Sequence, residues 1–250
     1  MAEIALRNVC KQFDSEHYGV KDFTLDIHDK EFVIFVGPSG CGKSTTLRLI
    51  AGLEDITDGE LWIDGELCNY LEPKEREMSM VFQNYALYPN MTVYGNIAYS
   101  LKIRKVPKKE IDQRVREVAR ILEIESLLDR KPAALSGGQK QRIAIVRSLC
   151  MNPEIILFDE VTAALDPEMV REVLDVILGL AKDGMTMLIV THEMNFARQV
   201  ANRIVFMDKG QIIEQAKPED FFTNPTTDRA KTFLNILNYE PRGTNYEENI

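Results

Sequence analysis

The chain has 250 residues, of which 45% are hydrophobic and 28% are charged, and its formal net charge is −9. This composition is ordinary for a globular protein, whereas the acidic balance argues against the broad basic surface that grips nucleic acid. No apolar run approaches the roughly 18–20 residues that span a bilayer, and the first residues lack the basic and apolar regions of a secretory signal. We therefore expect a cytoplasmic protein with no nucleic-acid partner.

The order of the predicted elements indicates an α/β fold. The spacing of apolar residues predicts helices over 43–51, 108–122 and 167–182, the first of them stopped by Gly52. Because strands come early and late while the middle is mostly helical, we expect a parallel-rich sheet interrupted by a helical insert at about 84–150. Apolar stretches rich in β-branched residues predict strands at 3–9, 22–27, 31–36, 60–64, 79–82, 155–159, 187–191, 203–207 and 211–214.

A glycine-rich loop of the pattern G-x-x-x-x-G-K-S follows the apolar stretch Phe32–Val36 and precedes a helix. Glycines let backbone N–H groups converge on phosphate oxygens, and the helix beginning near Lys43 directs unpaired N–H groups at the same anion. Lys43 would reach the β- and γ-phosphates, and the Ser44 hydroxyl would bind Mg²⁺. A glycine-rich turn without chemical meaning is the alternative, but the complete pattern in this context predicts a nucleotide site. Its residues are Gly37, Pro38, Ser39, Gly40, Cys41, Gly42, Lys43, Ser44 and Thr45.

The four cysteines divide into one loop residue and three others. Cys41 lies beside the predicted anion site and a helix N-terminus, and both features favour the thiolate. We expect alkylation of Cys41 to block nucleotide binding; the alternative is that it merely fills a tolerant position. Cys10, Cys68 and Cys150 are widely spaced and form no C-x-x-C pair, so we expect small core residues rather than metal ligands or disulfides.

A pair of carboxylates follows a second apolar strand, Ile155–Phe158. Asp159 at the strand end would hold Mg²⁺, and Glu160 would orient or deprotonate the attacking water. Many strands end in acidic surface residues, so the pair indicates a catalytic site only in combination with the phosphate loop upstream. Asp166 and Pro167 then fit the N-cap and first position of the next helix.

A second glycine-rich helix start lies at Leu135–Gln139 and precedes a helix that we expect to reach about Met151. Ser136, Gly137 and Gly138 would put exposed N–H groups at the helix N-terminus and form a second anion cradle. One chain with two phosphate-binding ends suggests that two chains meet head to tail, each closing the other's ATP. A plain helix start is the structural alternative.

The combination of these motifs resembles the nucleotide-binding subunit of ABC transporters. The resemblance rests on L-S-G-G-Q at 135–139, the phosphate loop, Asp159-Glu160, Ala164-Leu165-Asp166 and Thr191-His192, which occur in the order of the family. It covers roughly residues 3–238 and implies an α/β P-loop NTPase core with a parallel-rich sheet, a small antiparallel β subdomain and an inserted helical subdomain.

The resemblance also implies a division of the chain. We expect a single ABC ATPase domain over 1–240, with a RecA-like core made of 1–83 and 151–240 and a helical subdomain at 84–150. The polar, acidic residues 241–250 are expected to form a flexible tail.

Several site roles are implied for the chain's own ATP. By resemblance, Phe13 stacks on adenine, Gln83 contacts Mg²⁺ and water and senses the transmembrane partner, and His192 contacts the γ-phosphate. The predicted catalytic residues are Lys43, Gln83, Glu160 and His192. The predicted metal ligands are Ser44, Gln83 and Asp159, and the cofactors are ATP and Mg²⁺.

Other roles are implied for the ATP of a second protomer. Ser136, Gly138 and Gln139, with Gly137 in the same cradle, would bind the γ-phosphate held by the opposite chain, and Asp166 would cross the interface. The expected partner is therefore a second copy of this chain, or a second ABC subunit.

The front and back parts of the sequence resemble different importers. Segments 36–53, 82–89 and 130–139 are similar to ATPases of carbohydrate importers, whereas 160–166 and 190–197 are similar to those of polar amino acid importers. The resemblance implies separate transmembrane permease subunits, an external solute-binding protein, and a location on the inner face of the cell membrane. A natural mosaic, an engineered recombinant and ordinary drift within one family would each produce this pattern.

Two other functions would leave different traces. A soluble ABC ATPase that serves DNA repair or translation would carry long coiled-coil insertions or tandem cassettes, and a GTP switch would carry an N-K-x-D guanine reader. Neither trace is present in this sequence.

Overall fold

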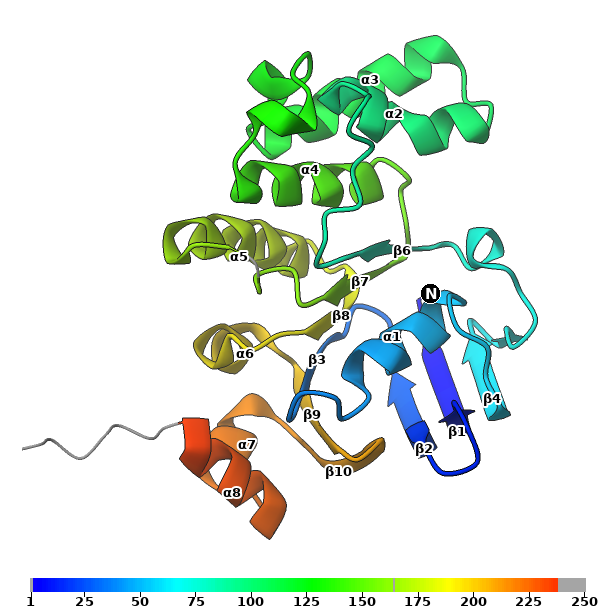
Figure 1. Cartoon of the computed structure of the whole chain (residues 1–250), viewed down its shortest axis with the longest axis vertical. Helices are drawn as coiled ribbons and strands as arrows, with labels where there is room; N and C mark the ends of the chain where they lie inside the picture. The colour runs from blue at the N-terminus through cyan, green and yellow to red at the C-terminus, as the bar shows by residue number, and fades with distance from the viewer. Residues whose placement is uncertain (1, 164, 238–250) are drawn as a thin grey trace, which may run out of the picture.

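The computed structural model describes residues 2–163 and 165–237, and its centre is a six-stranded sheet (Figure 1). The strand order is β10-β9-β3-β8-β7-β6, in which β6, β7, β8, β3 and β9 run parallel and β10 pairs antiparallel with β9. Every residue of β3, β7 and β8 is buried, which fits strands covered on both faces. The strands are β3 (Phe32–Val36), β6 (Met78–Val81), β7 (Ile155–Asp159), β8 (Thr186–Val190), β9 (Arg203–Asp208) and β10 (Gln211–Ala216).

A second, antiparallel sheet of four strands lies beside the first, with the order β2-β1-β4-β5. Alternate residues of β1, such as Ile4 and Leu6, turn to the core, and the partner strands bury Leu25 and Leu61 in the same cluster. The strands are β1 (Ile4–Gln12), β2 (Tyr18–Ile27), β4 (Asp58–Ile63) and β5 (Glu66–Leu67).

The helices form two groups. Figure 1 shows α2, α3 and α4 gathered at one end of the molecule, with α4 next to α5, while α1 lies between the two sheets. The first group comprises α2 (Val93–Ile103), α3 (Lys108–Ile121) and α4 (Gly137–Leu149), and the others are α1 (Lys43–Ala51), α5 (Pro167–Lys182), α6 (Met194–Val200), α7 (Pro218–Thr223) and α8 (Asp228–Leu237). Short 3₁₀ turns occupy Pro73–Glu75, Glu125–Leu127 and Pro132–Ala134.

The core consists of two apolar clusters separated by the large sheet. On β3, Ile34 and Val36 face the cluster that includes α2–α8, whereas Val33 and Phe35 face the cluster shared with α1 and the antiparallel sheet. Successive strand residues point to opposite faces, so one short strand serves both clusters. The loop that follows β3 is therefore anchored from both sides of the sheet.

The predicted fold class is confirmed, and each predicted strand is present, with the ends of β7 as predicted and those of the other strands shifted by up to four residues. The largest shift is at β2, which begins at Tyr18 because its antiparallel pairing with β1 continues, with register shifts, past the apolar stretch. The two-residue strand β5 was not predicted. The division at 83/84 and 150/151 stays a prediction, and the predicted tail at 241–250 lies outside the described residues.

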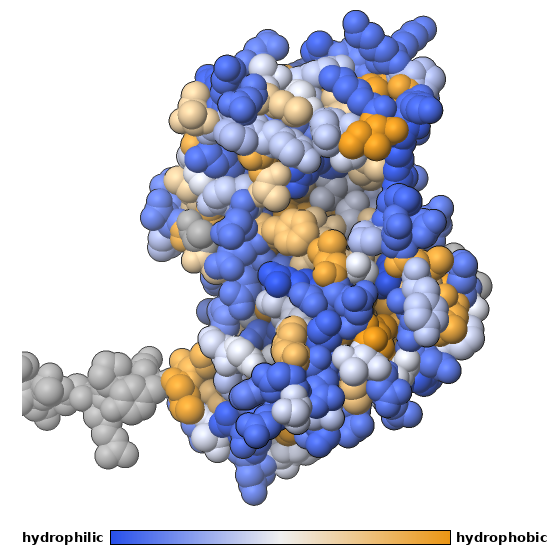
Figure 2. Space-filling model, turned by 45° about the vertical axis from the view of Figure 1, so that its right-hand side comes forward, coloured by the Kyte–Doolittle hydropathy of each residue, from blue (hydrophilic) through white to orange (hydrophobic). Residues whose placement is uncertain are grey.

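One face of the molecule is mostly polar. Figure 2 shows hydrophilic residues over most of one face, with apolar residues gathered mainly in its middle part. Within residues 2–163 and 165–237, no helix is long and apolar enough to cross a membrane.

Candidate nucleotide-binding and hydrolysis site

The loop between β3 and α1 has a backbone that only glycine can adopt at two positions. Gly37 has φ 149° and Gly42 has φ 103°. A Cβ at Gly37 would lie 2.2 Å from the Met207 carbonyl oxygen, and one at Gly42 would lie 2.2 Å from the Gly19 carbonyl oxygen. The loop thus packs tightly against the backbone of Met207 and Gly19. It is followed directly by the N-terminus of α1, where unpaired N–H groups can bind an anion.

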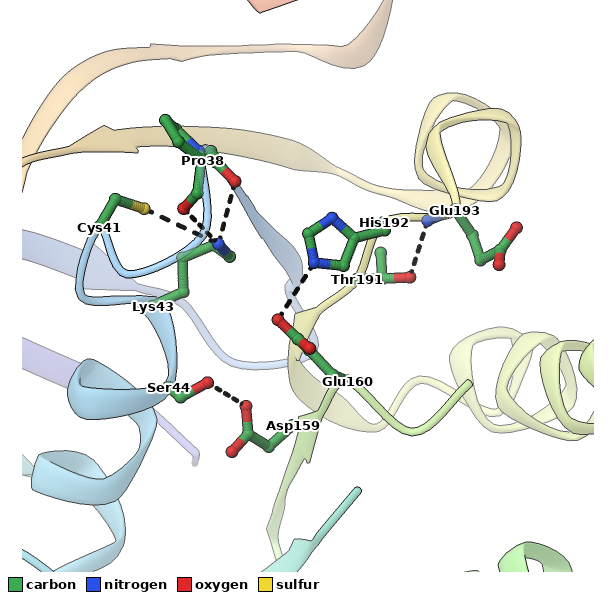
Figure 3. A network of polar contacts seen from close by, with 10 residues as sticks. Pro38, Cys41, Lys43, Ser44, Asp159, Glu160, Thr191, His192 and Glu193 are labelled. Carbon is green, nitrogen blue, oxygen red and sulfur yellow. Dashed lines mark hydrogen bonds and ion pairs between the residues drawn. The ribbon is translucent and has the colours of Figure 1, made fainter. Parts of the chain in front are cut away.

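Lys43 lies inside the loop that carries it (Figure 3). The residue is 4% exposed, and its Nζ donates hydrogen bonds to the carbonyl oxygens of Gly37 and Pro38, both at 2.9 Å. Both acceptors are neutral, so they do not neutralise the buried ammonium. A buried cation among neutral dipoles at a helix N-terminus favours an anionic ligand.

Cys41 corrects our expectation of a reactive thiolate. Its Sγ is 3.8 Å from the Lys43 Nζ, and the residue is 3% exposed. Burial raises the pKa of the Cys41 thiol, and the opposing effect of the Lys43 ammonium is weaker. Desolvation therefore outweighs the nearby positive charge, and the neutral thiol packs beneath the loop. Of the other three, Cys68 and Cys150 are buried as expected, whereas Cys10 is half-buried.

Three oxygen-bearing side chains lie near the start of α1. The Ser44 hydroxyl donates a hydrogen bond of 2.5 Å to Asp159 Oδ1, at the carboxyl end of β7. Burial raises the pKa of Asp159, partly offset by this hydrogen bond and by Arg48. Asp159 and Gln83 line one cavity of about 320 Å³. A hydroxyl, a carboxylate and an amide oxygen are hard ligands, and this set fits Mg²⁺.

Glu160 and His192 meet from two neighbouring parallel strands. The Glu160 Oε1 lies 3.1 Å from His192 Nε2. Glu160 has a left-handed backbone, φ 47°, and its N–H donates to the Val190 carbonyl oxygen at 3.0 Å. On the other side, the Thr191 hydroxyl accepts a hydrogen bond from the Glu193 N–H at 3.1 Å, which bends the chain around His192. The two turns bring the side chains together (Figure 3).

A cavity of about 300 Å³ connects the loop with both an aromatic residue and the carboxylate. Phe13, Tyr18, Gly40, Lys43 and Glu160 are among its lining residues. Phe13 is 58% exposed, so its ring is available to a ligand. The structure thus brings Phe13, the phosphate loop and Glu160 together around one cavity.

Two residues of this cavity, Tyr18 and Gly19, were not predicted from the sequence. Both line it, and a Cβ at Gly19 would lie 2.6 Å from Cε2 of the Phe13 ring. An aromatic residue followed by glycine just before the buried Val20 is the only local signal. It is too common a pattern to predict a site.

The Ser136 end of α4 is not part of either cavity. Ser136 Oγ accepts a hydrogen bond from the Gln139 N–H at 3.2 Å, and Gln139 Oε1 accepts one from the Ser136 N–H at 3.1 Å. This is a capping box, and Ser136 itself is exposed. The Gly138 N–H points to the Met169 sulfur at 3.2 Å. Ser136 is therefore exposed at the surface, but the N–H groups of Ser136, Gly138 and Gln139 have partners within the chain, so the expectation that this helix start exposes them is wrong for this structure.

Asp166 occupies the N-cap position of α5, with Pro167 following as the first helical residue, as predicted. Its side chain makes no capping hydrogen bond. The residue is exposed. Its carboxylate is therefore available for contacts beyond this chain.

The parallel sheet, the glycine loop and the carboxylates at one sheet edge define a P-loop nucleotide hydrolase. A family model described as ABC transporter matches residues 20–163. The chain belongs to this family, and it is an ATP-binding cassette that hydrolyses ATP.

The chain is similar to relatives named for glutamine transport and for oligosaccharide import. Glutamine transport ATP-binding protein GlnQ of Geobacillus stearothermophilus is 49% identical over 235 residues, which cover 90% of this chain and 97% of GlnQ. Oligosaccharides import ATP-binding protein MsmX of Bacillus subtilis is 48% identical over 226 residues, which cover 90% of this chain but 62% of MsmX. The uncharacterized ABC transporter ATP-binding protein YurJ of Bacillus subtilis is 51% identical, again over 90% of this chain but 61% of the relative.

Solved structures of dimeric cassettes are also similar. The dimeric structure of MJ0796, a bacterial ABC transporter cassette, has a TM-score of 0.77 and 36% identity, covering 86% of this chain and 98% of that chain. A dimeric post-hydrolysis state of MJ0796 bound to ADP and Pi has a TM-score of 0.76 and 35% identity over the same shares.

Proposed function

We propose that this chain is the ATPase subunit of an importer, and that two copies close head to tail around two MgATP. The relatives named for glutamine transport and oligosaccharide import support a solute that is a polar amino acid or a carbohydrate. Separate permease subunits, with an external solute-binding protein, would carry the solute. The chain itself would sit on the inner face of the cell membrane. The comparisons give no support to a soluble ABC ATPase outside transport.

The separation of the two anion cradles within one chain carries the proposal. Lys43, Ser44 and Glu160 line one cavity, whereas Ser136 is exposed elsewhere and lines neither that cavity nor the one at Gln83. A capped, glycine-rich helix start that faces outward can serve a nucleotide held by another copy. The Asp166 carboxylate is exposed and makes no capping hydrogen bond, so it is suited to contacts at the same interface.

Catalysis would rest on positioning and charge balance. The Lys43 ammonium and the loop N–H groups would hold the β- and γ-phosphates, and Phe13 would stack on the adenine. Ser44, Asp159 and Gln83 would hold Mg²⁺, which supplies positive charge to the phosphate oxygens when bound. Glu160 would accept a proton from the attacking water. His192 would hold Glu160 and contact the γ-phosphate.

Glu160→Gln tests this assignment. The amide keeps the size of the side chain but cannot accept the proton, so turnover should fall by roughly 10²–10⁴-fold. MgATP binding should persist, and light scattering should show dimers accumulating in MgATP while wild-type chains return to monomers. Wild-type turnover in Glu160→Gln would remove this residue from the mechanism.

A further inference from the structure

The segment that follows β6, residues 82–86, runs alongside α4 and is tied to it by side chains (Figure 1). Arg147 donates from Nη1 to the Ala86 carbonyl oxygen at 2.6 Å and from Nη2 to the Tyr85 carbonyl oxygen at 3.3 Å. Gln141 lies six residues nearer the start of α4 than Arg147. Its Nε2 donates to the Phe82 carbonyl oxygen at 3.5 Å. The contacts of Arg147 are shorter, so Arg147 is the main tie.

Two residues of this segment have a backbone conformation that is unfavourable for residues other than glycine. Tyr85 has φ 52° and Ala86 has φ 48°, so two consecutive non-glycine residues are left-handed. Such backbone costs free energy and persists only where the surrounding structure imposes it. The two carbonyl oxygens that Arg147 binds belong to these two residues. The guanidinium is therefore placed to impose the conformation.

Arg147 has few other uses in this structure. Arg147 is half-buried, and burial lowers the pKa of its guanidinium. Its hydrogen bonds to side-chain and backbone acceptors within the described residues are the two to the Tyr85 and Ala86 carbonyl oxygens. Withdrawing an arginine from water is costly unless its donors find acceptors, and here the loop backbone supplies two.

The same segment touches the other end of α4. The Tyr85 hydroxyl would lie 3.1 Å from a Cβ placed on Gly137, next to Ser136 at the helix start. Gln83, two residues before Tyr85, lines the cavity that contains Asp159. Helix α4 thus connects the exposed Ser136 cradle with the segment that carries Gln83.

We propose that Arg147 is a positioning residue for Gln83. Arg147 holds the backbone of Tyr85 and Ala86 against α4 and thereby determines the position of Gln83 relative to Asp159. The inference rests on the proposed function, in which Gln83 and Asp159 serve Mg²⁺ and water.

The first test compares Arg147→Met, Arg147→Lys and the control Arg116→Met. Arg116 is an exposed arginine of α3 that pairs with Asp112, so its loss removes the same side chain without touching segment 82–86. In Arg147→Met we expect kcat to fall and the Mg²⁺ concentration for half-maximal activity to rise, each by about tenfold, as for residues that support metal ligands. The Kd for ATP without Mg²⁺ should stay within about twofold of wild type, because the phosphate loop is intact. Arg147→Lys should recover part of the loss.

A double-mutant cycle with Gln83→Ala separates positioning from general damage. If Arg147 acts through Gln83, Arg147→Met should cause no further loss of kcat in the Gln83→Ala background. Additive losses would overturn the proposal, as would an unchanged Mg²⁺ requirement in Arg147→Met. A wild-type chain without ATPase activity would instead defeat the proposed function itself, so the two failures are distinguishable.

A second pair of variants keeps the test decisive if Arg147→Met does not fold. Ala86 is exposed, so replacing it leaves the core intact. Proline cannot adopt a positive φ, whereas glycine adopts it freely. Ala86→Pro should reproduce the loss of kcat and the raised Mg²⁺ requirement, and Ala86→Gly should behave as wild type. Wild-type kinetics in Ala86→Pro would contradict the proposal.

Discussion

The Nε2 atom of His192 lies 3.1 Å from Oε1 of Glu160, although the two residues are 32 positions apart in the chain. The contact follows from the sheet, because β7 and β8 are parallel neighbours and Asp159 pairs with Val190 in their register. Residues just past two such paired positions leave the sheet at the same edge. The imidazole thereby contacts one oxygen of the Glu160 carboxylate.

His192→Ala tests whether this contact matters for catalysis. Without the imidazole, the Glu160 carboxylate keeps its charge but loses its orientation, so kcat should fall by roughly 10²-fold or more while ATP affinity changes little. Phosphate release at saturating MgATP measures the effect. Adding His192→Ala to Glu160→Gln should cause little further loss, and fully multiplied losses would show that the two residues act independently.

Alkylation of Cys41 should be slow at neutral pH. Its thiol is buried and the pKa is raised by burial, so the reactive thiolate is scarce. Labelling should accelerate as the pH rises, and saturating MgATP should slow it further by holding the loop closed over the sulfur. Mass spectrometry of the labelled cysteines gives the rates, with the half-buried Cys10 as the internal comparison. Rapid labelling of Cys41 near pH 7 would contradict the buried position.

Glu214 predicts a pH dependence of stability. Its buried carboxylate accepts hydrogen bonds from the Thr226 N–H at 2.8 Å, and from the Thr227 N–H at 2.9 Å and hydroxyl at 2.7 Å. Burial alone would raise the pKa of Glu214, but these bonds outweigh it and lower the pKa below its ordinary value of 4.5. The folded protein thus binds this proton less tightly than the unfolded chain. The stabilisation is complete above the unfolded pKa and is lost as the pH falls through the folded pKa.

Glu214→Gln should therefore reduce the free energy of unfolding by about 2 kcal/mol near pH 7. The difference from wild type should shrink as the pH falls below the ordinary glutamate pKa. Urea unfolding at several pH values measures this, with Glu219→Gln on the exposed side of α7 as the control. A difference that stays constant down to acid pH would show that charge on Glu214 is not responsible.

Arg76 should be important for stability although it is remote from the phosphate loop. It is 5% exposed and donates to the carbonyl oxygens of Leu49 and Ile50 at the end of α1, both at 2.8 Å, and to that of Leu71 at 3.0 and 3.1 Å. Arg76→Met would leave these carbonyl groups without their donor, so the free energy of unfolding should fall by about 3 kcal/mol. Urea unfolding measures the loss, and the exposed Lys74→Met should change stability little.

Much of the fold and site could be predicted because the relevant signals are local. The phosphate loop is fixed by a strand, glycines and a helix start within one short stretch, and α5 has the bounds that its apolar spacing and Pro167 predict. The burial of Cys41 could not be predicted, because it depends on packing against segments distant in sequence. The same holds for Arg147, whose partners are 61 and 62 positions away.

Mixing two inactive variants tests the shared site most directly. Lys43→Met damages only the phosphate loop that binds a chain's own nucleotide. Ser136→Arg damages only the helix start that would contact the nucleotide of the partner chain. Each variant alone should be inactive, but a mixed dimer would contain one site with an intact Lys43 and an intact Ser136. ATPase activity should recover to roughly a quarter of wild type on equal mixing, because half of randomly formed dimers are mixed and each holds one good site. No recovery at any ratio, with mixed dimers seen in solution, would contradict a nucleotide shared between two chains.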